Sequence, residues 1–140
     1  MGKSIKKFEF LEHTADIKFR AYGKSLNELF ESCSMALSSY LAKENKISSK
    51  IKKQISIEGQ DIKSLLYKFL DEIIYLLDAE SFIISKSKVD IKNNKLNAVL
   101  HGDNVENYHG LDHIKAATYA EMYIKQKKDK TWEAQAVMDV

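Results

Sequence analysis

The sequence predicts an α+β fold in a single domain that spans residues 1–140, with two helices packed on one face of a mostly antiparallel or mixed sheet. Two segments carry apolar residues at helical spacing, whereas most of the remaining chain alternates between apolar and polar residues as strands do. Four strand-like segments follow the second helical segment without another helix between them. This order favours an α+β arrangement over alternating units with a parallel sheet.

The two helices are predicted from their apolar stripes and from the residues that cap them. A first helix is expected at about 26–42, where Ser25 can cap the start and Glu28 can complete a capping box. A second helix is expected at about 62–78, with Asp61 as its cap. Its apolar stripe is broader than a surface helix needs, so this helix should be central.

Strands are predicted where apolar residues recur at every second position. Two strands precede the first helix, and in the second of them Ile17, Phe19 and Ala21 alternate with polar residues. Further strands are expected at about 51–57, 82–91, 95–102, 114–124 and 132–140. Asn93 and Asn94 suit a tight hairpin turn because asparagine tolerates positive φ. The segment 101–113 is predicted to be a long polar loop.

The composition is typical of a globular protein, with 44% hydrophobic and 30% charged residues. No apolar run is long enough to span a bilayer, and no signal-like block follows the first lysines, so a cytoplasmic protein without membrane contact is expected. The 22 basic and 20 acidic residues are scattered, which does not by itself indicate nucleic-acid binding. The single cysteine, Cys33, is expected to be a buried apolar residue of the first helix.

Carboxylates are the candidate site residues that remain once the familiar motifs are excluded. The sequence contains no CxxC, HExxH, GxGxxG, GxxxxGK[ST] or GxSxG pattern. The acids of interest are Asp16 before the second strand, Asp103 and Asp112 in the polar loop, and Asp139 near the end. Asp139 precedes Val140, whose α-carboxylate adds a second negative charge if the chain ends there.

Adjacent carboxylates repel one another unless a cation or protons compensate their charge, and Ca²⁺ and Mg²⁺ prefer such oxygen ligands. If the first and last strands are neighbours in the sheet, Asp16 would meet Asp139 and the carboxylate of Val140 at one sheet end. The alternative is that Asp16 caps a turn and Asp139 is a solvated acid. Spacing alone favours this alternative.

The histidines and one lysine give weaker signals. His109 and His113 are close in sequence but lie in the expected loop, so a zinc site there lacks a third fixed ligand. His13 neighbours Asp16 and could donate a proton or a hydrogen bond to a substrate. Lys115 begins a strand of small residues, where it is either a solvated cation or a contact for an anion.

Four segments together resemble the archease family, in the same order and over nearly the whole chain. They are EHTADIKFRAYGKSLNELFESCSMAL, LLYKFLDEIIYLLD, HIKAATY and the closing WEAQAVMDV. The resemblance implies one archease-like domain that acts as an accessory activator of the RtcB-type tRNA-splicing ligase. Such a protein is not itself an enzyme. It promotes guanylylation of the ligase by GTP, supports multiple turnover and broadens nucleotide use, and it meets tRNA and GTP only through the ligase.

The resemblance also implies a divalent cation, Ca²⁺ or Mg²⁺, as a cofactor bound by Asp16, Asp139 and Val140. His13, Thr14 and Lys115 match the family pattern and are expected to support this site or to contact the ligase. Two positions depart from the pattern. Ala120 stands where the family often has a histidine, and Gln135 where it often has an arginine, so a side-chain role at either position is in doubt.

Two other functions are alternatives. A metal-dependent phosphohydrolase would use Asp16 and Asp139, but these residues do not supply a nucleophile, a base and a cation together. An RNA-binding module would use interleaved lysines, which occur at Lys50, Lys52 and Lys53 and again at Lys125, Lys127 and Lys128. Lysine runs of this kind are more often solvated faces.

Overall fold

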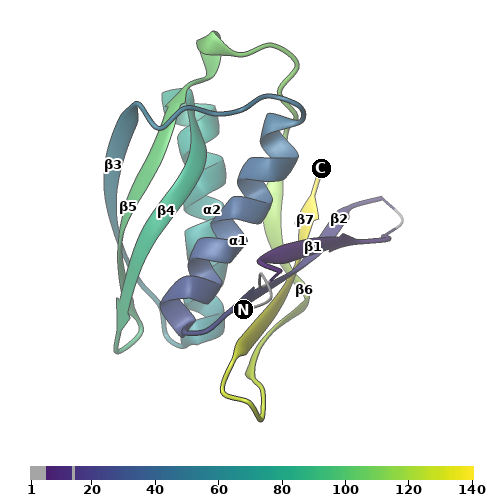
Figure 1. The fold of residues 1–140 in the computed structure, drawn as a ribbon, viewed down its shortest axis with the longest axis vertical. Coiled ribbons are helices and arrows are strands. Elements are labelled where there is room, and N and C mark those ends of the chain that lie inside the picture. Colours follow the sequence, from purple (N-terminus) through teal and green to yellow (C-terminus); the bar gives the residue numbers. More distant parts are fainter. Residues whose placement is uncertain (1–5, 14) are drawn as a thin grey trace, which may run out of the picture.

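The computed structural model describes residues 6–13 and 15–140, and it confirms the α+β class (Figure 1). Two helices, α1 and α2, span Leu26–Ala42 and Ile62–Glu80, and a short 3₁₀ turn, η1, spans Val105–Asn107. The strands are β1 (Phe8–Leu11), β2 (Ile17–Gly23), β3 (Ile51–Glu58), β4 (Phe82–Lys92), β5 (Lys95–Asn104), β6 (Ala116–Gln126) and β7 (Trp132–Asp139). The expected helices are both present.

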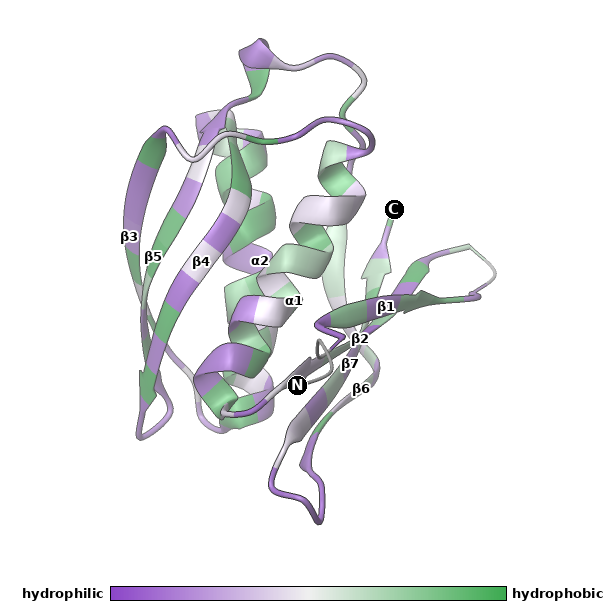
Figure 2. Cartoon of the chain, in the orientation of Figure 1, coloured by the Kyte–Doolittle hydropathy of each residue, from purple (hydrophilic) through white to green (hydrophobic). Residues whose placement is uncertain are grey.

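The strands divide between two antiparallel sheets, an arrangement that the sequence did not reveal. The strand order is β1-β2-β7-β6 in the first sheet and β3-β5-β4 in the second. Figure 1 shows α1 and α2 lying between the two sheets. Each sheet therefore has an inner face on the helices and an outer face on the opposite side. Hydrophobic and hydrophilic residues alternate along β4 and β5 in Figure 2, as expected for strands with one buried face.

The hydrophobic core fills the space between the helices and the inner sheet faces. Phe30 of α1 and Phe69 of α2 are fully buried, with ring centroids 5.8 Å apart. Cys33 is also fully buried, which confirms its predicted place. Burial raises the pKa of its thiol, so the unreactive protonated form is favoured.

Capping residues begin both helices where the sequence predicted. The backbone N–H of Glu28 donates to Ser25 Oγ, while the Glu28 carboxylate accepts from the backbone N–H of Lys24, one residue before the cap. In α2, Asp61 and Ser64 form a complete capping box. These bonds satisfy N–H groups that the first helical turn leaves without partners.

Polar side chains of α1 bond to the free edge of β4, which is an edge strand of the second sheet. Glu31 accepts from the Val89 N–H at 2.8 Å, and Asn27 accepts from the Ile91 N–H at 2.9 Å. Ser38, which is buried, donates to the carbonyl of Ile84. An unpaired strand edge is a site for aggregation, so these contacts both satisfy and cover it.

The expected polar loop is shorter than predicted, because β5 continues to Asn104. Asp103 is buried there and accepts hydrogen bonds from the Tyr108 hydroxyl, the Asn104 N–H and the Asn107 amide. These bonds hold the loop after β5. The hairpin before β5 agrees with its prediction, since Asn93 and Asn94 have φ values of 51° and 62°.

Strand β6 begins at Ala116 and not at the predicted 114, and its alternation is interrupted. Thr118 pairs with Val137, but the next pair joins Tyr123 to Gln135. Within this bulge Glu121 has a φ of 54°. Because an odd number of extra residues is inserted, the strand changes faces: Thr118 pairs with Val137 on the outer side, whereas Met122, which unbroken alternation would place on the same side, packs in the hydrophobic core. The uniform alternation predicted for 114–124 was therefore wrong.

In the described residues, neither helix combines the length and the apolar character that crossing a membrane requires.

Candidate functional site

Sheet register brings the two predicted acids to the same end of the first sheet. Ile17 of β2 pairs with Met138 of β7, so Asp16 and Asp139 occupy the next positions in this register. On the other side of β7, Asp139 pairs with Ala116 of β6, and the Lys115 N–H donates to the Asp139 carbonyl at 2.8 Å. The condition under which the two acids would meet, that an early strand neighbours the last one, is fulfilled by β2 and β7.

Both acids belong to the outer face of this sheet. Phe19 and Ala21 of β2 are fully buried on the inner face, and successive residues point to opposite faces. Asp16 therefore shares the outer face with Lys18. On β7, Ala136 pairs with Phe19 on the inner side, which assigns Asp139 to the outer side. The Asp139 side chain is exposed and that of Asp16 is half-buried.

His13 lies between Asp16 and a third acid, Glu121, that sequence reasoning did not select. Its Nε2 is 3.0 Å from the Glu121 carboxylate, and its Nδ1 is 3.7 Å from Asp16 Oδ2. Nδ1 is buried and has no hydrogen-bond partner among the described residues. When Nε2 carries the proton and donates to Glu121, Nδ1 keeps a lone pair beside Asp16.

Glu121 is held in place by side chains from two neighbouring strands. Lys18 Nζ lies 2.9 Å from the Glu121 carboxylate oxygen that does not contact His13. The pKa of Glu121 is below its usual value, mainly because of the hydrogen bond from Lys18 and secondly because of the one from His13. The Gln135 amide donates to the Glu121 carbonyl at 2.8 Å and accepts from Arg20. Glu121 was not predicted because its place depends on the bulge, which leaves no signal in a single sequence.

The two positions that depart from the family pattern have different surroundings. Gln135, where an arginine was expected, is buried and supports the bulge, so it has a structural role. Ala120, where a histidine was expected, is exposed, and its N–H donates to Thr118 Oγ1. Thr14 lies outside the described residues. Lys115 is exposed at the sheet end that also carries Asp139.

The chemistry of this sheet end is that of oxygen ligands. Nowhere in residues 6–13 and 15–140 do three His, Cys, Asp or Glu side chains form a group able to hold a metal ion. A cation site here would therefore need Asp16, Asp139 and an oxygen of Val140. Carboxylate and carbonyl oxygens suit a hard divalent cation, and the unpartnered Nδ1 of His13 leaves a polar group nearby for a bound species to satisfy.

The other predicted residues do not join this site. Asp103 stabilises the loop after β5, and the Asp112 N–H donates to the Leu41 carbonyl at the end of α1. His113 lies 3.4 Å from Asp78 of α2, on the exposed surface.

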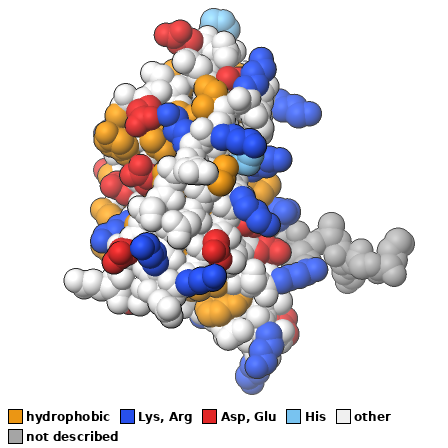
Figure 3. Space-filling view, turned by 90° about the vertical axis from the view of Figure 1, so that its left-hand side faces the viewer, with side chains coloured by type: hydrophobic (Ala, Val, Ile, Leu, Met, Phe, Trp, Pro, Cys, Tyr) orange, Lys and Arg blue, Asp and Glu red, His pale blue; other side chains and the backbone are white. Residues whose placement is uncertain are grey.

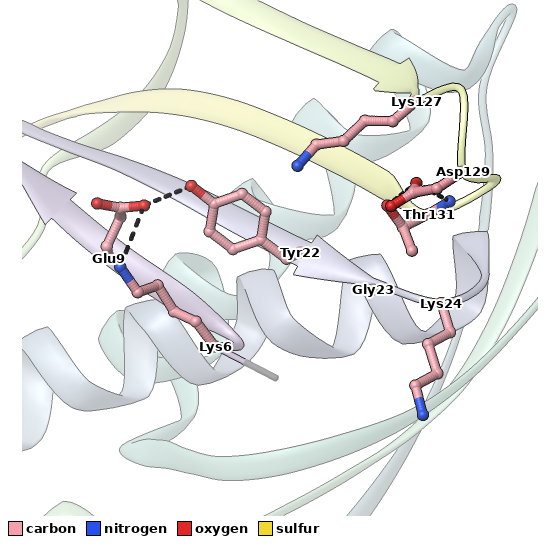
Figure 4. Close-up of a pocket in the computed structure, with 8 residues that line it drawn as sticks. All are labelled: Lys6, Glu9, Tyr22, Gly23, Lys24, Lys127, Asp129 and Thr131. Atoms are coloured by element: carbon pink, nitrogen blue, oxygen red, sulfur yellow. Dashed lines mark hydrogen bonds and ion pairs between the residues drawn. The ribbon is translucent and has the colours of Figure 1, made fainter. Parts of the chain in front are cut away.

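A hollow of about 460 Å³ lies at the opposite end of β2 and β7, where Gly23 pairs with Trp132 (Figure 4). The Tyr22 hydroxyl donates to Glu9 there. The pKa of Tyr22 is raised mainly by burial and, to a smaller extent, by this hydrogen bond. Lys127 lies over the Tyr22 ring, 5.2 Å from its centroid. Lys6 and Lys127 already form ion pairs with glutamates, so this hollow has little uncompensated charge.

Comparison with known proteins identifies the family. Residues 8–140 match the Archease protein family (MTH1598/TM1083). The sequence is 37% identical to protein archease of Pyrococcus abyssi, over 97% of this chain and 100% of the relative, and 37% identical with the same coverage to protein archease of Pyrococcus furiosus. It is 32% identical to the archease-like protein of Drosophila melanogaster, over 96% of this chain and 90% of the relative.

Two solved structures share the fold. The solution structure of Methanobacterium thermoautotrophicum protein 1598 superposes with a TM-score of 0.76 at 29% identity, covering 97% of this chain and 100% of that one. The crystal structure of a Thermotoga maritima protein described as an archease and possible chaperone gives a TM-score of 0.61 at 21% identity, covering 100% and 98%.

Proposed function

This chain belongs to the archease family, and from that premise we propose that it is a non-catalytic activator of an RtcB-type tRNA-splicing ligase. In this proposal it promotes guanylylation of the ligase by GTP, allows multiple turnover and broadens nucleotide use. The chemistry of RNA joining belongs to the ligase, and tRNA and GTP are contacted in the ligase active centre. The proposal places the protein in the cytoplasm, without membrane contact.

The proposed working end is the sheet end that carries Asp16, Asp139 and Val140. The observation that supports it most is the register of β2 and β7, which brings Asp16 and Asp139 to the same end of the first sheet although they are far apart in sequence. Oxygens of these residues would hold Ca²⁺ or Mg²⁺, and the cation would supply positive charge for nucleotide phosphates. Without it, facing carboxylates would repel each other and any phosphate.

The neighbouring residues have supporting roles in this proposal. Glu121 and Lys18 orient His13, so that its Nδ1 faces Asp16. Lys115 is an exposed cation beside Asp139 and is suited to an acidic group of the ligase or to a phosphate oxygen. Thr14, between His13 and Asp16 in sequence, is included on the family pattern alone.

The test compares Asp139→Ala with Asp71→Ala, which removes an exposed aspartate from α2. Pre-tRNA ligation by the cognate ligase is measured under multiple turnover, and binding of Ca²⁺ and Mg²⁺ to the protein alone is measured by calorimetry. Asp139→Ala should lose both ligase stimulation and cation binding while keeping the wild-type circular dichroism spectrum. Asp71→Ala should keep all three properties, because Asp71 is exposed on α2 and is not among the residues assigned to the proposed site.

Two results would count against this function. Ligase stimulation by Asp139→Ala at the wild-type level would remove Asp139 from the working end. Hydrolysis of small phosphoesters by the wild-type protein alone, abolished in Asp16→Ala, would instead favour a metal-dependent phosphohydrolase.

A further inference from the structure

The outer face of the β3-β5-β4 sheet carries a row of basic residues. Lys52 of β3 pairs with His101 of β5, which in turn pairs with Lys86 of β4. Lys88 follows Lys86 on the same face, because residues two apart in a strand point the same way. We call Lys52, His101, Lys86 and Lys88 the basic row. Figure 3, which views this side of the molecule, shows lysine and arginine side chains gathered mainly along one half of it.

The positive charge of the basic row is not compensated. Among the described residues, no carboxylate lies within 4.0 Å of its three lysines, although adjacent Lys53 pairs with Glu80 at the edge of the sheet. Of the acids on this face, Glu58 pairs with Lys95 toward the other end, whereas Asp90 directly follows Lys88 on the outer side of β4 and forms no ion pair among the described residues. His101 separates Lys52 from Lys86 in the register, so these two lysines are about 10 Å apart, and Lys88 is two residues along β4 from Lys86. Their like charges repel one another only weakly across solvent, and an anionic partner would compensate them together.

The outer face of the first sheet provides a comparison within the same protein. There, Lys18 pairs with Glu121, and both Lys125 and Lys127 pair with Glu133. That face balances its own charges, whereas the basic row does not. The uncompensated charge is therefore a particular feature of the second sheet.

A hollow of about 360 Å³ adjoins the basic row on the same face. Val99 contributes an apolar surface to it, and Gln54, Asn97, Lys88 and Asp90 also line it, so the hollow has one acidic side chain beside its basic one. The amides of Gln54 and Asn97 are exposed, and each offers both donors and an acceptor. A volume of this size is at the lower end for small-ligand sites, and the amide groups suit the polar edge of a nucleobase.

We propose that this face binds an RNA strand, with phosphates on the basic row and one base over the hollow. The charge and the hollow indicate a nucleic-acid strand, and the choice of RNA rests on the proposed function, in which the ligase acts on RNA. Phosphate contacts supply most of the affinity in such complexes, and they are independent of base sequence. The face would hold substrate RNA close to the ligase.

The surface chemistry favours RNA over an acidic protein. Protein interfaces have buried cores enriched in aromatic residues. The exposed large hydrophobic residues of the described chain, Phe10, Tyr75 and Tyr119, lie on β1, α2 and β6, away from this face. Aromatic stacking is also absent from the face in the described residues, so we expect binding that is modest in affinity and sensitive to salt.

The test uses the protein alone and a fluorescently labelled single-stranded RNA of mixed sequence, with binding followed by anisotropy. Three phosphate contacts on a single strand predict a slope of about −2 in log affinity against log salt, or roughly 20-fold weaker binding at 200 mM than at 50 mM salt. The variant K52E/K86E/K88E should bind at least about 10-fold more weakly at 50 mM salt. The variant Q54A/N97A should bind more weakly with an unchanged salt slope.

The control variant K7E/K24E/K63E carries the same change in formal charge at exposed lysines outside this face. It should bind RNA nearly as well as the wild type. Equal weakening in both triple variants, or no saturable RNA binding by the wild type, would overturn the proposal. Tighter binding of poly-glutamate than of RNA, lost in K52E/K86E/K88E, would assign the face to an acidic protein instead.

These results separate the two proposals. Loss of ligase stimulation in Asp139→Ala with unchanged RNA binding would support the working end without contradicting RNA binding by the basic row. RNA binding that disappears in K52E/K86E/K88E would support this face even if the protein did not stimulate the ligase.

Discussion

Replacing Glu31 by alanine tests whether α1 stabilises the fold by bonding to the edge of β4. The Glu31 carboxylate accepts from the Val89 N–H at 2.8 Å, and Val89 is only 3% exposed. In Glu31→Ala this N–H would have no protein partner in a site that water reaches poorly. The cost should be about 1.5–3 kcal/mol, the range for a hydrogen bond to a charged group.

The expected shift in melting temperature follows from the size of the chain. An unfolding entropy of about 2 cal/mol/K per residue gives roughly 0.3 kcal/mol/K for this protein. A loss of about 2 kcal/mol should therefore lower the melting temperature by about 7 °C. Glu31→Gln keeps a carbonyl acceptor at the same place, so it should lose less than about 1 kcal/mol. Urea and thermal unfolding followed by circular dichroism measure both variants.

Two outcomes would refute this explanation of the edge. One is a Glu31→Ala protein as stable as the wild type, which would mean that water satisfies the Val89 N–H without cost. The other is equal destabilisation by Glu31→Gln and Glu31→Ala, which would show that the negative charge, and not an acceptor for Val89, is what the fold requires.

Three further predictions concern the core and the loop after β5. Gly102→Ala should destabilise the protein by about 1–3 kcal/mol in urea unfolding, since an added Cβ would lie 2.1 Å from the Ile83 carbonyl oxygen. The hydrogen bond from the Tyr108 hydroxyl is the main reason that the pKa of Asp103 is below its usual value. The ionised carboxylate therefore stabilises the fold above about pH 4, and this stability is lost as the pH falls through the pKa that Asp103 has in the folded protein. The wild type should therefore lose more stability than Asp103→Asn on acidification below about pH 4, and equal losses would exclude this contribution. Cys33 should react with a thiol reagent only in denaturant, because it is fully buried and its pKa is raised, and rapid reaction of the native protein would contradict its burial.

The helices were predictable because their signals are local. Ser25 and Asp61 cap helices that begin at the next residue, and the apolar stripes continue without a break. The hairpin at Asn93 was equally local, since the positive φ of a tight turn selects asparagine or glycine. Each of these features depends on residues within one or two helical turns, so a single sequence contains the whole signal.

The division into two sheets was not predictable in this way. Alternation shows that a strand has one buried face, but it does not show which strand is its neighbour. The serines of α1 were the available clue, because Ser34 and Ser38 are buried among apolar residues and both bond to β4. Such a serine indicates that a helix contacts a backbone edge. The sequence does not say which edge.

The bulge in β6 explains why Glu121 was not selected from the sequence, whereas Asp16 and Asp139 were considered there as acids of one sheet end. Asp16 and Asp139 lie at the ends of regular strands, where counting residues from a buried position gives the correct face. Glu121 lies within an insertion of odd length, where counting from a buried position no longer gives the face, and the faces of the later residues of β6 are reversed. Ala116 and Thr118 are small enough to lie on either face of a sheet, so the sequence contains no sign that the alternation is interrupted. Within the bulge the Glu121 carboxylate reaches His13, and this contact joins β6 to the approach to β2 across the intervening strand β7, which no local pattern encodes.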